Sequence, residues 1–375
     1  MKYYLIVGEA SGDLHASCLM MEIKKNDKDA DFRFFGGDLM QSQGGVLVKH
    51  YREMAFMGFV SVIKNLPAIL SNMELCKKDI LSYSPDVLIL VDYPSFNLKI
   101  AKAVKHSLNI PVYYYISPKI WAWKEYRIKS IKKYIDKMFC ILPFEVDFYS
   151  KHNYHVDYIG NPSVDELLYK FKNYQLQSQF RAEHELSQKP IVAILAGSRK
   201  QEVISNLHYM LKVAKSFPQL QPVVAAAPGL SLDFYKSVIG DENVKLVFDK
   251  THELLINSQA ALVTSGTATL EAAILNIPQV VCYKVGGGKL TYAIMSRVLK
   301  VKYVSLVNLI VNKKVVTELL AHQLTVDNLT EELKNILPGG KNRESVLEGY
   351  SQMKSLLGTP GAPAKAAKII ADSLV

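Results

Sequence analysis

Short, continuous runs of apolar residues recur along the chain, and segments with helical periodicity separate them. Strands that are apolar on both sides need cover on both faces of the sheet, as in a parallel sheet flanked by helices. The pattern therefore predicts an α/β fold. The expected strands span residues 3–7, 32–35, 87–91, 112–116, 137–141, 156–159, 191–195, 221–226, 244–248, 260–263 and 279–282.

These strands fall into two successive sets, which a polar stretch at residues 170–189 separates. A chain of 375 residues is also too long for one ordinary core, so we expect two doubly wound domains. We place them at residues 1–168 and 169–344, followed by a C-terminal segment at 345–375. Ligands of open α/β sheets bind beyond the carboxyl ends of the strands, so the default active site is the cleft between the domains.

The formal net charge of +10 indicates an anionic partner. Since no nucleic-acid motif accompanies it, we favour a phosphorylated substrate or an anionic membrane; a basic surface that only serves solubility is the alternative. The chain opens without a signal peptide, and its four cysteines form no CxxC pair, so neither a zinc site nor a redox dithiol is expected. Together these features predict a cytoplasmic protein.

The first expected strand ends in a turn that runs from Gly8 to Asp13. It lacks the G-x-G-x-x-G spacing of dinucleotide sites, which disfavours NAD. Gly8 and Gly12 have no Cβ, so the turn can bring its backbone close to a ligand. The alternative is an ordinary strand-to-helix turn in which Asp13 serves as a cap.

Asp92 stands at the carboxyl end of the third expected strand, where a carboxylate of the cleft would lie. Burial against Tyr93 and Phe96 would raise its pKa toward the range that suits a general base. The alternative makes Asp92 the cap of the next helix, with Pro94 early in that helix. His15 is a second candidate for the base and ranks below Asp92.

Two turns of the second domain have the features of phosphate sites. The first is a Gly-Ser turn at Ser198, where backbone N–H groups are exposed and Arg199 adds a forked, permanently charged donor. The second turn has small polar residues at a helix start, and Glu271 lies about one turn later, where it could accept hydrogen bonds from a ribose. The alternatives are a surface arginine and an ordinary cap. The small residues are Ser265, Gly266 and Thr267.

Two segments point to lipid. Residues 54–63 are uncharged and almost wholly apolar but too short to span a bilayer, so they form either an interfacial segment or a buried core helix. The side chains expected at the membrane are Met54, Phe56, Met57, Phe59, Val60 and Ile63. A basic, aromatic stretch is typical of an anionic membrane surface or of a solvated helix face, and it comprises Trp121, Trp123, Lys124, Arg127, Lys129, Lys132 and Lys133.

Ordered motifs from residue 8 to residue 320 resemble those of the lipid-A-disaccharide synthase family. The sequence departs from many members at Ala196 and Val307, where proline is usual, and at Asn161, where histidine is usual. The motifs are GEASGD at 8–13, MGFV at 57–60, D-x-P-x-F-N at 92–97, YYISPKIWAW at 114–123, LPFE at 142–145, GSR at 197–199, SGTATLE at 265–271, SLVNLI at 305–310 and ELL at 318–320.

The resemblance implies a GT-B fold and an inverting glycosyltransferase that needs no metal or cofactor. The donor would be UDP-2,3-diacylglucosamine, the acceptor 2,3-diacylglucosamine 1-phosphate, and the product the β(1→6)-linked lipid A disaccharide 1-phosphate. The enzyme would be peripheral on the inner face of the inner membrane. The last helix would cross back onto the first domain, and a homodimer that exchanges C-terminal parts is compatible with the family.

On this hypothesis Asp92 accepts the proton of the acceptor's 6-hydroxyl, and Arg199 offsets the charge that builds on the leaving UDP. Glu271 would hold the ribose, while Ser198, Ser265, Gly266 and Thr267 would join Arg199 at the pyrophosphate. The acceptor sugar would lie against Gly8, Ser11, Gly12, Asp13 and Asn97.

Two other functions stay open. A UDP-sugar 2-epimerase could use the same fold and nucleotide site, but it has no use for the apolar segment at 54–63. A non-enzymatic peripheral membrane protein would explain the charge and that segment, but it would not need the SGTATLE motif.

Overall fold

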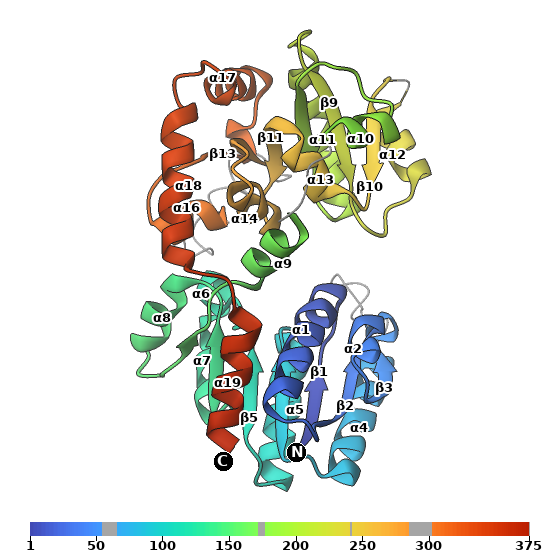
Figure 1. Cartoon of the computed structure of the whole chain (residues 1–375), viewed down its shortest axis with the longest axis vertical. Helices are drawn as coiled ribbons and strands as arrows, with labels where there is room; N and C mark the ends of the chain where they lie inside the picture. Colours follow the sequence, from blue (N-terminus) through green and yellow to red (C-terminus); the bar gives the residue numbers. More distant parts are fainter. Residues whose placement is uncertain (55–65, 172–176, 241, 285–301, 375) are drawn as a thin grey trace. The chain divides into compact units, whose positions relative to one another are not determined.

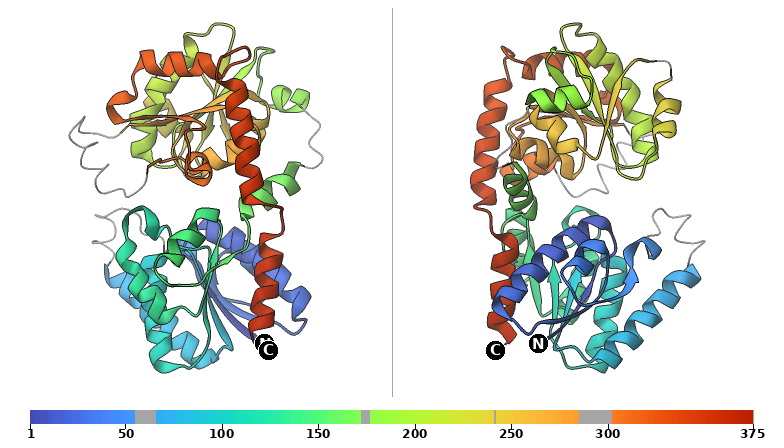
Figure 2. Two further views of the ribbon diagram at one scale, coloured as in Figure 1. Left: turned by 90° about the vertical axis from the view of Figure 1, so that its left-hand side faces the viewer. Right: turned by 45° about the vertical axis from the view of Figure 1, so that its right-hand side comes forward.

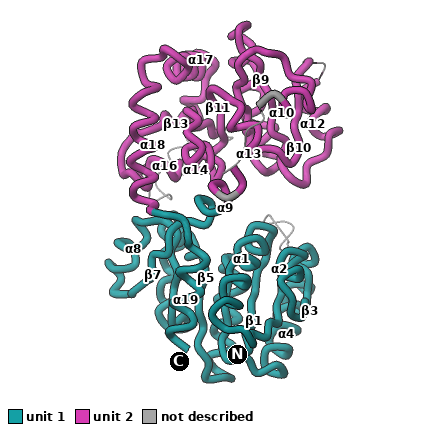
Figure 3. Tube along the Cα trace, viewed as in Figure 1, with its two compact units in different colours: residues 1–165, 359–375 teal, residues 166–358 magenta. Residues whose placement is uncertain are grey.

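The computed structural model describes residues 1–54, 66–171, 177–240, 242–284 and 302–374 (Figure 1). The chain divides into two compact units, shown in teal and magenta in Figure 3. Unit 1 comprises Met1–Asp165 and Thr359–Val375, and unit 2 comprises Glu166–Gly358. Each unit is built on a parallel sheet, so the predicted α/β fold is confirmed.

Unit 1 contains a seven-stranded sheet in the order β3-β2-β1-β4-β5-β6-β7, and all of its pairings are parallel. The order reverses between β1 and β4, as in a doubly wound fold. The strands are β1 (Lys2–Ile6), β2 (Asp31–Gly36), β3 (Val46–His50), β4 (Val87–Val91), β5 (Val112–Tyr115), β6 (Lys137–Cys140) and β7 (Asp157–Tyr158).

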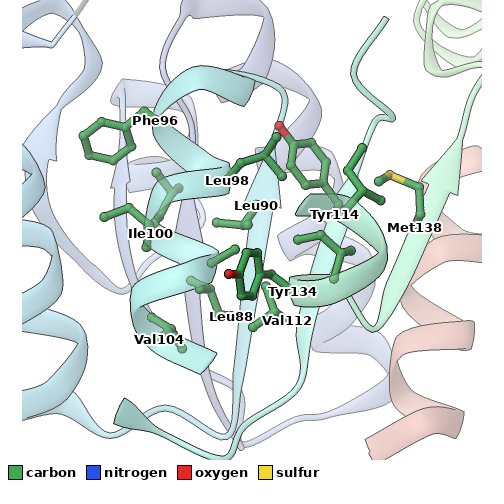
Figure 4. Packing of buried hydrophobic residues seen from close by; sticks show 14 of the residues in the cluster. Leu88, Leu90, Phe96, Leu98, Ile100, Val104, Val112, Tyr114, Tyr134 and Met138 are labelled. Atoms are coloured by element: carbon green, nitrogen blue, oxygen red, sulfur yellow. The ribbon is translucent and has the colours of Figure 1, made fainter. Parts of the chain in front are cut away.

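Successive side chains of the unit 1 strands enter two different cores, because a strand points alternate residues to opposite faces. Tyr3 and Leu5 lie in the core on one face, and Tyr4 and Ile6 lie in the core on the other. Figure 4 shows the second of these cores, where side chains of β4 and β5 pack against the helix that follows β4. The helices are α1 (Ala10–Asn26), α2 (Asp38–Ser42), η1 (Tyr51–Glu53), α4 (Leu66–Tyr83), α5 (Pro94–Ser107), α6 (Ile120–Trp123), η2 (Glu125–Arg127), α7 (Ile128–Tyr134), α8 (Pro143–Ser150) and α19 (Ala362–Leu374).

The C-terminal helix α19 packs against α1, so the end of the chain returns to unit 1 (Figure 2). The return begins at Thr359 and not at the expected residue 345. The reason is that the preceding helix, α18 (Arg343–Leu357), packs on α16 (Leu306–Val311) within unit 2. Gly358, with φ of +78°, ends α18 in a backbone conformation that residues other than glycine rarely adopt.

Unit 2 contains a six-stranded parallel sheet in the order β10-β9-β8-β11-β12-β13. Its strands are β8 (Ile191–Leu195), β9 (Gln221–Ala226), β10 (Lys245–Phe248), β11 (Ser258–Thr264), β12 (Gln279–Tyr283) and β13 (Thr317–Leu320). Its other helices are α9 (Pro162–Phe171), which begins in unit 1, and α10 (Gln177–Glu183), α11 (Lys200–Lys215), α12 (Leu232–Ile239), α13 (Thr251–Ile256), α14 (Thr267–Ile274), η3 (Ala321–Gln323) and α17 (Val326–Ile336).

The eleven predicted strands all form, and the sequence analysis missed β3 and β13. Both are edge strands. They are only partly buried, and β13 carries the polar pair Thr317-Glu318, so neither has the continuous apolar run of a central strand.

None of the described helices is long and apolar enough to cross a membrane. Within the described ranges, no group of three or more His, Cys, Asp or Glu side chains could hold a metal ion. All four cysteines are free thiols.

Candidate active site

The turns after β1 and β4 lie side by side, because these strands pair in parallel with Ile6 opposite Leu90. Asp92 follows β4 at this edge of the sheet. Helix α5 begins only at Pro94, and its N-cap residue is Tyr93. The alternative that Asp92 caps this helix is therefore wrong, and its carboxyl group is available for another role.

Asp92 and Tyr93 both adopt the left-handed backbone conformation, with φ of +43° and +45°. Such a conformation costs a residue other than glycine about 1–3 kcal/mol, so the surrounding structure must hold it. The buried Asn97 amide donates hydrogen bonds to the carbonyl oxygens of Val91 at 3.2 Å and Asp92 at 2.7 Å. The Tyr114 hydroxyl donates to the same Asp92 oxygen. Buried side chains thus fix the turn that presents the carboxyl group.

Burial raises the pKa of Asp92 to about 6, and the neighbouring Glu9 carboxyl contributes in the same direction while Lys119 opposes it. The predicted upward shift is confirmed. A carboxylate with this pKa is ionised at neutral pH but more basic than an ordinary aspartate, which suits proton abstraction.

Glu9 is a residue of this site that the sequence analysis missed. Its Oε1 accepts a hydrogen bond from the Ser11 hydroxyl at 2.9 Å, and the carboxyl group interacts with that of Asp92. Glu9 follows β1 just as Asp92 follows β4. The pairing of these two strands would have revealed it, but strand order is not visible in one sequence.

Packing within the protein leaves no room for a side chain at Gly8 and little room at Gly12. A Cβ on Gly8 would lie 2.3 Å from Cγ of Tyr93, whose ring stacks on Phe96 with 5.4 Å between centroids. A Cβ on Gly12 would lie 3.2 Å from Cβ of Val7. The glycines therefore allow a helix and a ring to approach β1, and their contact with an acceptor stays a prediction.

Asp13 and Asn97 are buried and do not fit the expected direct contact with the acceptor. The Asp13 carboxylate accepts hydrogen bonds from the N–H groups of Gly37, Leu39 and Met40, at 2.9, 3.0 and 3.1 Å. It therefore caps α2 instead of its own helix, while Asn97 holds the turn at Asp92. Within the same helix, α1, Ser11 is exposed and His15 is half-buried.

In unit 2, the turns after β8 and β11 also lie side by side, since Leu195 pairs with Val263. The residues predicted for the nucleotide belong to these two turns and to the starts of the helices that follow them, and their joint contact with a nucleotide stays a prediction. The set consists of Ser198, Arg199, Ser265, Gly266, Thr267 and Glu271.

The turn after β8 is closed by a carboxylate. Gly197 has φ of +119°, and Glu202 accepts hydrogen bonds from the N–H groups of Ser198 at 3.0 Å and Arg199 at 3.3 Å. The Arg199 side chain is 72% exposed, and its guanidinium lies 3.8 Å from Glu202. The main-chain donors predicted for a phosphate are thus occupied by Glu202, while the guanidinium reaches into solvent.

The turn after β11 is more open. An added Cβ on Gly266 would have no atom of the described residues within 4 Å, and Thr267 is exposed at the first position of α14. The Ser265 hydroxyl donates to the carbonyl oxygen of Val304 at 3.0 Å. Main-chain N–H groups at the start of α14, and not this hydroxyl, are therefore the donors left for a phosphate.

The predicted lipid-facing segment is mostly beyond the described residues. Met54 is buried, so it does not face a membrane, and its carbonyl oxygen accepts a hydrogen bond from the Tyr93 hydroxyl at 3.3 Å. Outside the described residues lie Phe56, Met57, Phe59, Val60 and Ile63.

The basic, aromatic stretch divides into a buried and an exposed part. The Trp121 indole donates to the buried Glu145 carboxylate at 3.0 Å, so this ring belongs to the core. Trp123 is 58% exposed and Tyr126 is 69% exposed, and the Lys124 ammonium lies 3.9 Å from the Trp123 ring centroid. The exposed part thus places a cation beside aromatic rings, and its contact with an anionic membrane stays a prediction.

The chain matches the family described as lipid-A-disaccharide synthetase over residues 3–366. A lipid-A-disaccharide synthase of Myxococcus xanthus is 37% identical over 99% of this chain and 97% of its own length. One of Acidobacterium capsulatum is 33% identical over 96% of this chain and 93% of its own length.

Two solved structures share the fold at low sequence identity. The UDP-GlcNAc 2-epimerase of Neisseria meningitidis bound to UDP-GlcNAc has a TM-score of 0.70 at 15% identity and covers 100% of this chain and 99% of its own. The calicheamicin glycosyltransferase CalG4 has a TM-score of 0.60 at 12% identity over 99% of this chain and 97% of its own. The sequence relatives decide between the two activities: the chain belongs to the lipid-A-disaccharide synthase family and is a glycosyltransferase of lipid A biosynthesis with the GT-B fold.

Proposed function

We propose that the chain transfers 2,3-diacylglucosamine from UDP-2,3-diacylglucosamine to the 6-hydroxyl of 2,3-diacylglucosamine 1-phosphate. The products are the β(1→6)-linked disaccharide 1-phosphate and UDP. The observation that carries this proposal is the Asp92 carboxyl at the end of β4, with its pKa raised to about 6. Family membership supports the choice of sugar substrates.

In the proposed reaction Asp92 accepts the proton of the acceptor's 6-hydroxyl. At the same time the oxygen of that hydroxyl forms a bond to the anomeric carbon of the donor. The bond from that carbon to the UDP oxygen breaks on the opposite face, which inverts the configuration. The transition state resembles an oxocarbenium ion, as in inverting glycoside chemistry. A general base of this kind contributes about 10²–10⁴ in rate.

The negative charge of the leaving UDP is stabilised by residues at the carboxyl edge of the unit 2 sheet. Arg199 provides charge-assisted hydrogen bonds, which are roughly twice as strong as neutral ones. The N–H groups at the start of α14 add a smaller contribution of about 0.3–1 kcal/mol. Glu271 accepts hydrogen bonds from the ribose hydroxyls.

We further propose that the enzyme works at the inner face of the inner membrane. Burying ten methylenes of an acyl chain is worth about 8 kcal/mol, so diacylated substrates stay in the bilayer. Trp123 and Tyr126 are exposed beside basic side chains, and Leu66 and Leu70 are exposed one turn apart on α4. Trp123→Ala combined with Tyr126→Ala should weaken co-sedimentation with anionic vesicles, and undiminished co-sedimentation would remove these rings from the membrane surface.

The test of function is to incubate the full chain with both diacylated substrates and to follow UDP release and the disaccharide by mass spectrometry. A parallel incubation with UDP-N-acetylglucosamine tests for the 2-epimer. Disaccharide without epimer is the expected result. Epimer formation without disaccharide would establish the epimerase instead.

A further inference from the structure

A histidine that no motif includes lies against the carboxylate proposed to bind ribose. The two come from different helices, His252 from α13 and Glu271 from α14. Nε2 of His252 lies 3.2 Å from Oε2 of Glu271, and their side chains are only 16% and 20% exposed. The ring of Phe171 packs edge-on against the imidazole, with 6.3 Å between centroids. The imidazole is therefore held between an aromatic ring and the carboxylate.

Other charged side chains lie close to His252 and Glu271. Glu166 of α9 interacts electrostatically with both His252 and Glu271. The neighbouring Glu253 is paired with Lys170 at 3.4 Å and with Lys250 at 3.5 Å. Glu253 is thus matched by two lysines, whereas Glu271 pairs with His252.

We infer that His252 is a positioning residue for the recognition of a ribose diol by Glu271. The imidazole takes one carboxylate oxygen and leaves Oε1 to accept from the hydroxyls of a nucleoside diphosphate. Without this partner the carboxylate can rotate, and the binding of ribose has to fix it at an entropic cost. This inference rests on the proposed binding of UDP by unit 2.

The predicted effect is specific to the ribose hydroxyls. A hydrogen bond of ordinary strength is worth about five- to tenfold in affinity. His252→Ala should therefore weaken UDP binding by about tenfold. The same substitution should leave the binding of 2′,3′-dideoxy-UDP, which lacks both hydroxyls, nearly unchanged.

The experiment is calorimetric titration of the full chain with UDP and with 2′,3′-dideoxy-UDP. The variants are His252→Ala, His252→Gln, whose amide can still donate to Glu271, and His208→Ala, an exposed histidine on α11 as the matched control. Thermal melting establishes that each variant folds. His252→Gln should recover part of the preference for UDP, and His208→Ala should keep all of it.

Three results would overturn the inference, and they differ in whether the proposed function fails with it. If His252→Ala weakens both ligands equally, the histidine is only structural. If it keeps the full preference for UDP, Glu271 needs no positioning, and the proposed function survives. If the unaltered chain binds neither ligand, the nucleotide site and the proposed function fail as well.

Discussion

The two sheets present opposite chemistry at the same topological position. At the carboxyl edge of unit 1, the carboxyl groups of Glu9 and Asp92 interact; burial partly desolvates that of Asp92, whose backbone is held in the left-handed region. At the corresponding edge of unit 2, Arg199 is largely exposed, and a Cβ on Gly266 would meet no atom of the described residues within 4 Å. The same architecture can thus carry a base or an anion site, and the residues of the connecting turns decide which.

The two edges also differ in the step at which their free-energy cost arises, folding in unit 1 and ligand binding in unit 2. The strain at Asp92 and the desolvation of its carboxyl are already present in the folded chain, offset by Asn97 and Tyr114. In unit 2, Glu202 occupies the N–H groups of the turn, and the ordering of Arg199 is left to the binding step. Preorganisation of the base should make it sensitive to small changes, whereas the nucleotide site should respond mainly to loss of charge.

The sharpest way to break the comparison is to remove the base. Asp92→Ala should lower the rate of UDP release at least 100-fold, because the 6-hydroxyl loses its proton acceptor. UDP binding, which depends on unit 2, should persist in calorimetric titration. Asp147→Ala, which removes an exposed carboxylate of α8, is the control and should keep its activity. Near-normal turnover of the Asp92 variant would exclude the residue as the base.

The Asp92 carboxyl should lower the free energy of unfolding at neutral pH, where it is ionised. Its pKa of about 6 in the folded chain lies above the ordinary value of 3.8, so folding favours the protonated form. The stabilising contribution is complete below pH 4 and is lost as the pH rises through 6. Asp92→Asn removes the ionisation, and its unfolding free energy near pH 8 should exceed that of the unaltered chain by up to about 3 kcal/mol. Denaturant unfolding at pH 8 and pH 4 measures this difference, which should fall to below about 1 kcal/mol at the lower pH.

Removing the Arg199 guanidinium should weaken UDP binding more than it slows the chemical step. Arg199→Ala should weaken UDP binding by about 10- to 100-fold, since charge-assisted hydrogen bonds contribute about 1.5–3 kcal/mol. Lys200→Ala removes an equal charge from the next residue and controls for the long-range field. Equal losses in the two variants would mean that only net charge matters at this edge.

The sequence predicted the parts of both edges that depend on local pattern. Asp92 and Arg199 follow the apolar strands β4 and β8, and Glu271 lies in α14, the helix that follows β11, so these places could be foreseen. Glu9 and His252 could not, because their roles depend on which strands and helices become neighbours in space. Burial decided the rest: Asp13 looks available in the sequence but is enclosed by main-chain donors.

The smallest expected effect tests whether the carboxyl pair is functional. The Glu9 carboxyl raises the pKa of Asp92, so Glu9→Gln should lower that pKa and move the acid limb of the rate profile to lower pH. Turnover near pH 8, where Asp92 is ionised in both proteins, should change much less. The profile is measured as kcat/KM between pH 4.5 and 9. Ser11→Ala, which removes only the hydrogen bond to Glu9, provides an intermediate case. An acid limb that stays in place in Glu9→Gln would mean that burial alone tunes the base, and the contrast between the two edges would then rest on Asp92 and its strained turn.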